Sequence, residues 1–317
     1  MFAEAEAGMN TGTLKHMVLL AFGVNLILTA AFFYTRSEIN DLGAASMNGR
    51  ADQIRRLLKT DPSQMNKKLR PGETPLFYAM NYGYLDVAKE FLAAGMAPNA
   101  KSNHGEAPLL SATYYGRTEI LELFAKHGAD LNIQDKDGYT AALWAARFNL
   151  LEPLKLLLRL GALPNAIDNK ASPLLAAVQA GNSEIVSLLL AEKADVNRPG
   201  PNGITPLHLA THLAHPEIFN QVLAQPEVDL DVRTSFGYSA IDIAIMDEHF
   251  DEIASLVDHG ANLATVDALG LSQLFRVLLA GYPKEKFLNS DRVVALTFQD
   301  CRNKTLIEKF SLAEFCR

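Results

Sequence analysis

Small, apolar and turn-forming residues recur along most of the chain at an almost constant interval. The clearest marker is a Thr-Pro-Leu-like tripeptide that occurs seven times, with first residues 33, 33, 32, 33, 34 and 33 positions apart. An interval of this size is typical of repeat proteins whose unit is a pair of short helices. The markers are Thr74-Pro75-Leu76, Ala107-Pro108-Leu109, Thr140-Ala141-Ala142, Ser172-Pro173-Leu174, Thr205-Pro206-Leu207, Ser239-Ala240-Ile241 and Ser272-Gln273-Leu274.

Other positions keep the phase of this marker and predict two helices in each unit. A small or modest apolar residue follows the marker by five positions, where stacked helices must approach closely. A turn residue follows by nine, and an apolar pair that would form the core of the second helix follows by seventeen and eighteen. The small positions are Ala79, Ala112, Ala145, Ala177, Ala210, Ala244 and Val277; the turn positions are Gly83, Gly116, Asn149, Gly181 and Gly281, with Ala214 and Glu248 as departures.

Two stretches carry a resemblance to a known family. Thr205-Pro206-Leu207-His208-Leu209-Ala210 and Gly128-Ala129-Asp130-Leu131-Asn132 closely resemble the ankyrin-repeat pattern, and the resemblance covers about residues 37–282. It implies an all-α solenoid of about eight antiparallel helix pairs with β-hairpin-like fingers at one edge. Physical reasoning agrees, because one pair cannot bury its apolar face whereas a stack of pairs can.

The two ends of the repeat region depart from the pattern. A degenerate first unit near residues 40–68 carries polar residues that are typical of an N-terminal cap, and residues 283–317 lose the phase and are predicted to form a C-terminal capping tail. Within the repeats, the segment 226–231 replaces the usual Gly-Ala-Asp-Leu-Asn turn where the spacing grows to 34. We interpret this irregularity as a local bulge and not as a domain boundary.

The N-terminal region contains an apolar run that the repeats do not explain. After residues 1–16, the 18 residues from Met17 to Tyr34 carry no charge, which at a helical rise spans roughly 27 Å and is close to a bilayer core. We therefore expect residues 17–35 to form a single-pass transmembrane anchor that contacts lipid through residues 17–34. A buried core helix and a cleaved signal peptide are the alternatives.

Charge and cysteine content limit the compartment and the partners. The chain has 36 acidic and 29 basic residues, a net charge of −7, and no basic tract, which argues against a nucleic-acid partner. Flanking basic residues do not decide the orientation of the anchor. Cys301 and Cys316 can pair in an oxidising compartment and would contribute about 3 kcal/mol, or they can be two reduced thiols. A disulfide between these cysteines would favour a repeat domain that lies outside the cytoplasm.

Candidate chemistry is sparse, and we expect no enzyme, catalytic residue or cofactor. His208 and His212 lie four apart on one predicted helix, a spacing that can bind a metal, but the family resemblance gives His208 a structural role in the turn. An accessory envelope protein with a metal or redox role, through this histidine pair or through Cys301 and Cys316, is the alternative function. The leading hypothesis is a membrane-anchored adaptor or inhibitor that binds another protein.

The resemblance implies that this partner contacts the concave face formed by the inner helices and finger tips. Tyr, Trp and Arg dominate binding hot spots, and these types gather in repeats two to four. The position seven after the marker is expected to face outward, which favours Tyr114 and Arg147, whereas the position eight after it packs largely between repeats. The predicted partner-binding residues are Tyr82, Tyr114, Tyr115, Trp144, Arg147 and Phe148, with His104, Lys136 and Asp137 on the polar rim.

Overall fold

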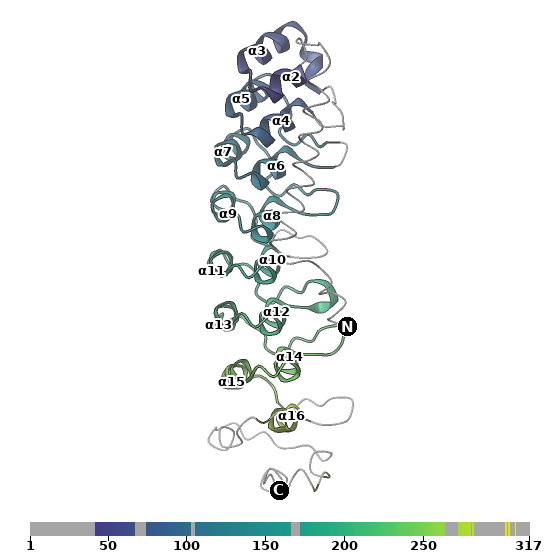
Figure 1. Ribbon diagram of the computed structural model, residues 1–317, viewed down its shortest axis with the longest axis vertical. Helices are drawn as coiled ribbons and strands as arrows, with labels where there is room; N and C mark the ends of the chain where they lie inside the picture. Colours follow the sequence, from purple (N-terminus) through teal and green to yellow (C-terminus); the bar gives the residue numbers. More distant parts are fainter. Residues whose placement is uncertain are drawn as a thin grey trace. The chain divides into compact units, whose positions relative to one another are not determined.

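The computed structural model consists of short antiparallel helix pairs joined by hairpin-like loops (Figure 1). It describes residues 42–66, 74–102, 105–165, 172–263, 272–279 and 281, with Arg302, Lys304 and Glu308. The pairs are α2 (Leu42–Met47) with α3 (Ala51–Thr60), α4 (Pro75–Tyr82) with α5 (Leu85–Ala93), α6 (Pro108–Tyr114) with α7 (Thr118–Lys126), α8 (Ala141–Arg147) with α9 (Leu151–Arg159), α10 (Pro173–Gln179) with α11 (Ser183–Ala191), α12 (Pro206–His212) with α13 (Pro216–Leu223), and α14 (Ala240–Met246) with α15 (Phe250–Asp258).

Three further elements complete the described chain. The 3₁₀ turns η2 (Pro62–Asn66) and η3 (Pro201–Gly203) lie in loops, and α16 (Gln273–Leu279) packs against α14. The predicted all-α repeat fold is confirmed. Three predicted features lie outside the described residues: the second helix of the eighth unit, the anchor over 17–35 and nearly all of the tail over 283–317.

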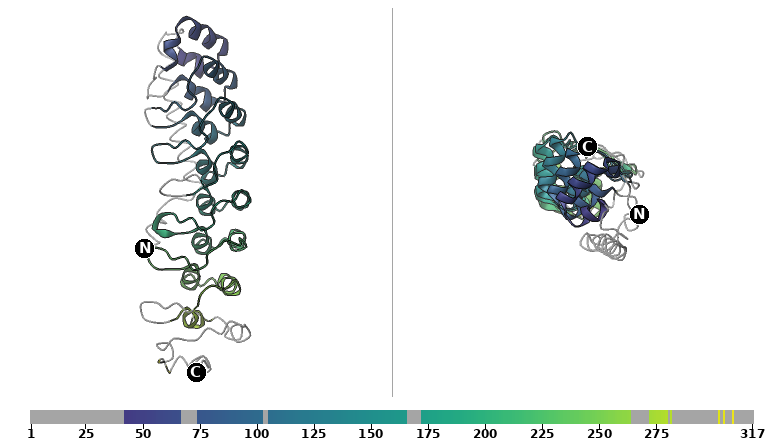
Figure 2. Two further views of the ribbon diagram at one scale, coloured as in Figure 1. Left: turned by 180° about the vertical axis from the view of Figure 1, so that it is seen from behind. Right: turned by 90° about the horizontal axis from the view of Figure 1, so that it is seen from above.

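The chain divides into two compact units, Met1–Asn169 and Lys170–Arg317. In the first unit, α2, α4, α6 and α8 pack side by side as an inner row, and α3, α5, α7 and α9 pack as an outer row. In the second unit, α10, α12, α14 and α16 form the inner row, and α11, α13 and α15 the outer row. In each unit the described loops between pairs project from the inner row on the side away from the outer row (Figure 2).

The recurrent marker works as a helix start. Its first residue has extended backbone at the N-cap of the inner helix, and Pro75, Pro108, Pro173 and Pro206 follow in the first turn, where a missing N–H costs nothing. At Ser172 the hydroxyl accepts a hydrogen bond from the Leu175 N–H at 3.1 Å. The marker therefore sets the N-terminus of each inner helix.

The alanine five positions after the marker permits close helix packing. Ala79, Ala112 and Ala145 in the first unit are fully buried, at 0% exposure. Their carbonyls also accept the N–H that closes the turn into the outer helix, as in the 2.8 Å bond from Arg117 to Ala112. A larger side chain there would force neighbouring inner helices apart.

The turn inside each pair has left-handed backbone even where glycine is absent. Gly83 has a φ of 78°, and the two sequence departures, Ala214 and Glu248, have φ of 48° and 57°. The next residue still donates to the buried alanine carbonyl, as in the 2.9 Å bond from His249 to Ala244. Packing of the pair therefore overrides the local preference of alanine and glutamate against this conformation.

Glycine at this turn also makes room for the following repeat. A Cβ on Gly83 would lie 2.8 Å from Nε of Arg117, and one on Gly49 would lie 2.9 Å from the Tyr84 ring. Arg117 reaches back over the turn, and its Nη2 donates to the carbonyl of Asn81 at 3.0 Å. The absence of a side chain is thus required by a contact that the single-repeat pattern does not reveal.

An asparagine or aspartate ladder holds successive loops in register. Asn99 accepts a hydrogen bond from the Asp130 N–H at 2.9 Å, and Asn132 accepts one from Leu163 at 2.9 Å. Asn197 accepts from Asp229, and Asp231 accepts from Asn262. The final asparagine of the Gly-Ala-Asp-Leu-Asn stretch therefore bonds to the loop of the next repeat.

The irregular segment 226–231 remains within this ladder. Glycines such as Gly128 and Gly260 give the corresponding loop its left-handed residue, whereas Pro226 fixes φ near −65° and excludes that conformation. One extra residue is accommodated there, because Asn197 and Asp229 are 32 positions apart whereas Asn132 and Leu163 are 31 apart. No boundary between the compact units falls at this segment.

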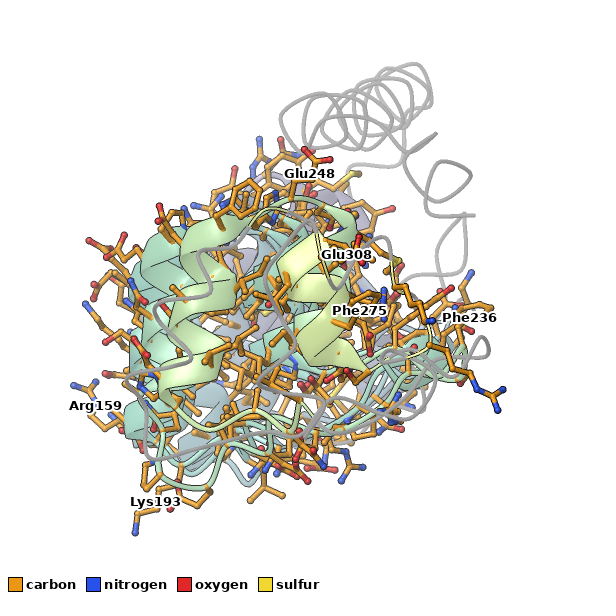
Figure 3. All side chains as sticks on the ribbon, turned by 90° about the horizontal axis from the view of Figure 1, so that it is seen from below. Arg159, Lys193, Phe236, Glu248, Phe275 and Glu308 are labelled. Carbon is orange, nitrogen blue, oxygen red and sulfur yellow. The ribbon has the colours of Figure 1, made fainter. Side chains whose placement is uncertain are left out.

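A buried polar network joins α14 to α16 in the second unit. Asp242 accepts hydrogen bonds from the Ser239 N–H at 3.0 Å and from Gln273 Nε2 at 2.8 Å, and it pairs with Arg276. Figure 3 shows Phe275 close to the helices, whereas Phe236 lies far out at the edge of the molecule. Phe275 is fully buried and Phe236 is 51% exposed.

The close approach at Gly83 predicts unequal effects of the same substitution at two turns. Gly83→Ala should destabilise the chain more than Gly116→Ala, because both alanines would carry left-handed strain of about 1–2 kcal/mol but only the first would displace Arg117. Loss of the bond from Arg117 to Asn81 should add about 1 kcal/mol. Urea unfolding of the full chain measures both; equal losses would contradict the packing role of Gly83.

Candidate partner-binding surface

The predicted binding residues lie where inner helices of the first unit end. Tyr114 and Arg147 are the last residues of α6 and α8, and Tyr115 and Phe148 are the C-caps that follow them. Because α6 and α8 pack side by side, their last turns bring these residues together. Tyr82 ends α4 in the same way and stacks on Tyr84 with a centroid distance of 5.7 Å.

Five half-buried rings, Tyr114, Tyr115, Tyr139, Trp144 and Phe148, form what we call the aromatic cluster. Tyr114 meets Trp144 edge-on at 5.7 Å and Phe148 edge-on at 5.4 Å. Trp144 stacks on Phe148 at 5.1 Å, and Tyr139 lies 6.0 Å from Trp144. Each contact of this kind stabilises a fold by about 0.5–1.5 kcal/mol beyond simple burial. The cluster therefore ties repeat three to repeat four while leaving part of its ring surface accessible.

Tyr114 contributes more to packing than its sequence position predicts. Its ring contacts three other rings of the cluster, and burial raises the pKa of its hydroxyl above 10. The expectation that the position seven after the marker faces outward holds for Arg147, which is exposed, and fails in part for Tyr114. The cause is Trp144 in the next repeat, whose large ring reaches the end of α6.

Asp135 anchors the finger of repeat four to the aromatic cluster, and the sequence analysis missed it. Its Oδ2 accepts a hydrogen bond from Nε1 of Trp144 at 3.1 Å, and its Oδ1 accepts from the backbone N–H groups of Asp137 and Tyr139. The sequence signal that could have identified Asp135 is a residue with a hydroxyl or carboxylate group five positions before the marker. Thr234 accepts from the Tyr238 N–H in the same way, at 3.2 Å.

Arg147 is held in place by an aromatic ring. Its guanidinium carbon lies 5.9 Å from the centroid of Tyr139, and its Nη1 lies 3.5 Å from the Tyr139 hydroxyl. A cation over a tyrosine face is stabilised by about 0.5–1 kcal/mol at an exposed site. Lys136 and Asp137 are exposed at the finger tip, as predicted for a rim, and His104 lies outside the described residues.

His208 serves the fold. Its Nδ1 accepts from the Thr205 backbone N–H at 3.2 Å, and its Nε2 donates to the Tyr238 carbonyl at 3.1 Å. Burial lowers its pKa from the ordinary 6.5, although carbonyl contacts with Tyr238 and Val232 oppose that shift. Both ring nitrogens are therefore engaged, in agreement with the structural role that the resemblance implies.

His212 points to a different partner and not to a shared metal site. Its Nδ1 lies 2.9 Å from Oδ2 of Asp247 on the next repeat. Within the ranges that the structure describes, no group of three or more His, Cys, Asp or Glu side chains is arranged to hold a metal ion. Cys301 and Cys316 lie outside those ranges, and their pairing stays a prediction.

In the described ranges, no helix is both long and apolar enough to cross a bilayer. The predicted anchor at residues 17–35 is not among them.

Comparison with known proteins identifies the family to which the repeated helix pairs belong. The profile of the family described as ankyrin repeats (3 copies) matches residues 42–135, 123–199, 143–233 and 174–267, which together span most of the chain. The chain belongs to the ankyrin-repeat family. The resemblance that the sequence suggested is therefore confirmed.

The individual relatives match this chain over only part of their length. Regulatory protein NPR3 of Arabidopsis thaliana is 32% identical over 99 residues, which cover 31% of this chain and 16% of that protein. Alpha-latrocrustotoxin-Lt1a of Latrodectus tredecimguttatus is 26% identical over 146 residues, which cover 46% of this chain and 10% of the toxin. The chain thus spans less than a fifth of these relatives, and their activities are not transferred to it.

A solved structure supports the fold. The crystal structure of the ankyrin repeat domain of Bcl-3, described as a unique member of the IkappaB protein family, matches with a TM-score of 0.59 at 24% sequence identity. The match covers 64% of this chain and 92% of that domain. At this identity the similarity establishes the architecture alone.

The bonding of His208 predicts that stability depends on pH. The folded pKa lies below 6.5, so the unfolded state binds the proton more readily, and the free energy of unfolding should fall as the pH drops below about 6.5 towards the folded pKa. His208→Gln should be less stable than the wild type at neutral pH, and this difference should shrink in acid. Urea unfolding across that pH range measures it.

The exposed His259, at the C-cap of α15 in the same unit, provides the matched control. His259→Gln removes an imidazole without disturbing a buried turn. A pH-independent gap between the wild type and His208→Gln would contradict the assignment of this acid sensitivity to His208.

Proposed function

We propose that this ankyrin-repeat protein is an adaptor or inhibitor that holds another protein on repeats two to four. Ankyrin repeats generally mediate protein–protein interaction, so a binding role follows from the family. The relative named Regulatory protein NPR3 is consistent with a regulatory adaptor. The location of the surface is our own inference from the first unit.

The observation that carries this proposal is the aromatic cluster with Arg147 beside it. Tyr and Trp rings with a neighbouring arginine are the groups that contribute most to protein interfaces. The half-buried rings are fixed by contacts with one another, so little conformational entropy is lost when a partner covers them. Tyr82 extends the aromatic surface onto repeat two, and Lys136 and Asp137 supply a polar rim.

The proposed surface can be tested with substitutions that leave the core intact. Arg147→Ala combined with Lys136→Ala should reduce capture of the partner in a crosslinked pull-down from membranes, because both side chains are exposed and neither contributes to the packed core. The melting temperature should stay within a degree or two of the wild type. Tyr114 is unsuited to this test, because its removal would disturb the cluster.

The matched control lies on the outer face of the same repeat. Lys155→Ala with Arg159→Ala removes two exposed cations of α9 that pair only with surface carboxylates at 2.9 and 3.2 Å. Figure 3 shows Arg159 pointing away from the helices. If both double variants capture the partner as well as the wild type does, the binding surface lies elsewhere.

We further propose that the repeats are tethered to a membrane and lie outside the cytoplasm. Support for the tether is the uncharged run from Met17 to Tyr34, and support for the compartment is the pair of cysteines, Cys301 and Cys316, which can form a disulfide under oxidising conditions. Tethering would raise the local concentration of the binding surface near a partner in the same membrane.

Charge placed in the apolar run should abolish the tether. Val24→Arg with Leu26→Arg should release the chain into the alkaline-soluble fraction, because each arginine costs about 3 kcal/mol near the centre of a span. Val24→Leu with Leu26→Val, which keeps the run apolar, is the control and should stay in the membrane pellet.

The compartment is tested separately in vesicles with the cytoplasmic face outward. The repeats should resist added protease until detergent opens the vesicles. Digestion of the repeats in sealed vesicles would place them in the cytoplasm, and wild-type protein in the alkaline supernatant would exclude an anchor.

A further inference from the structure

The charges beside the aromatic cluster are unbalanced, and they point to the chemistry of the bound segment. Asp135 is the carboxylate nearest the rings along the finger, and its oxygens already accept three N–H groups, from Trp144, Asp137 and Tyr139. A carboxylate that accepts several hydrogen bonds in this way is satisfied within the fold. Its charge is directed into the finger and not towards a partner.

Arg147, by contrast, has no acidic partner within ion-pair distance in the described part of the chain. Elsewhere in the same unit, Arg159 pairs with Glu122 at 3.2 Å, and Arg55 forms two bonds with Glu90. Arg147 is exposed and rests on the ring of Tyr139 instead. Contact with the ring fixes the planar guanidinium, which can then bind a carboxylate through two parallel hydrogen bonds.

The finger tip adds to this excess of positive charge. Lys136 is exposed, and in the described residues no carboxylate lies within ion-pair distance of its ammonium group. The chain as a whole carries a net charge of −7. Among the described residues of this edge, the two exposed cations Arg147 and Lys136 stand against one exposed carboxylate, that of Asp137. The edge therefore differs from the average of the molecule, and it is complementary to an acidic group.

We propose that the surface on repeats three and four binds an extended, acidic segment of the partner protein, which places an apolar side chain on the aromatic cluster and a carboxylate on Arg147. This inference rests on the proposed function. Tyr139 lies between the two subsites, 5.9 Å from the guanidinium and 6.0 Å from the Trp144 ring. The subsites are thus at most about 12 Å apart, which an extended chain spans in two to four residues.

The test is selection of random displayed peptides on the full chain, on Arg147→Glu and on Arg56→Glu. Arg56 is the matched control, because it is exposed on α3 of the same unit and donates only to a backbone carbonyl, that of Asp52. Peptides selected on the wild type should carry Asp or Glu two to four positions from an aromatic or aliphatic residue. On Arg147→Glu the acidic residue should be replaced by Lys or Arg, and on Arg56→Glu it should be retained.

Affinity measurements on one selected peptide make the test quantitative. Trp144 is the only tryptophan of the chain, so its fluorescence reports binding at the cluster directly. Arg147→Ala should weaken binding by about tenfold or more, the usual effect of losing a charge-assisted hydrogen-bond pair. Arg147→Lys should restore only part of that loss, because an ammonium group keeps the charge but neither stacks on Tyr139 nor binds both oxygens. Binding should also weaken with rising salt.

Three results would overturn the inference: no peptide is selected, the selected peptides lack acidic residues, or the acidic residues persist on Arg147→Glu. Each of these results can be distinguished from failure of the proposed function. If the pull-down captures a partner that the Arg147 and Lys136 double variant loses, while the peptide selection fails, the proposed binding surface would stand and the further inference would fail. The partner would then be recognised through a folded surface and not through an extended acidic segment.

Discussion

Within each compact unit of this protein, a helix pair can bury its apolar side only against the neighbouring pairs. The fully buried alanines of the inner row, such as Ala79 and Ala112, show how little space separates neighbours. Stability in such a stack is the sum of weak units and of the interfaces between them. Exposed positions at the helix ends and finger tips, such as Arg147 and Lys136, are not needed for these interfaces, so binding residues can vary there without loss of the fold.

The aromatic cluster combines both tasks, and this limits how it can change. Tyr114 of repeat three contacts Trp144 and Phe148 of repeat four, with ring centroids 5.7 and 5.4 Å apart, and so contributes to the interface between these repeats. The ring contacts hold these side chains rigid and leave their outer edges exposed, where a partner can contact them. Arg147 and Lys136 have no such structural duty, so specificity can be altered there at little cost to stability.

Much of the fold was predictable because its signals repeat within a single unit. The N-cap and proline of each marker, the buried alanine and the turn glycine each have a local physical reason, and the helix pairs lie where those signals place them. At Ala214 and Glu248 the local signal was misleading, because packing imposes a left-handed turn that these residues disfavour.

The features that sequence analysis did not predict depend on contacts between units. Arg117 reaches over Gly83 in the preceding repeat, and Trp144 draws Tyr114 into the cluster. Asp135 accepts from the Trp144 indole, a contact that requires the finger to fold back on its own helix. None of these pairs recurs in every repeat, so a periodic pattern does not contain them. For the proposed binding surface, the sequence predicts the residue types and the repeats, whereas the division between packing and exposed residues depends on contacts between repeats that the sequence does not reveal.

The ladder of asparagine and aspartate side chains has a consequence for how the chain can change in length. Every rung joins loops that are one repeat apart, so gain or loss of a few residues inside a repeat would misalign two rungs at once. The single extra residue near Pro226 is tolerated because it falls in the loop before Asp229, whose backbone N–H still donates to Asn197 across 32 positions. Duplication or removal of a whole helix pair leaves every rung intact. The molecule is therefore built to lengthen or shorten in complete repeats, and the reach of its binding surface changes in the same discrete steps.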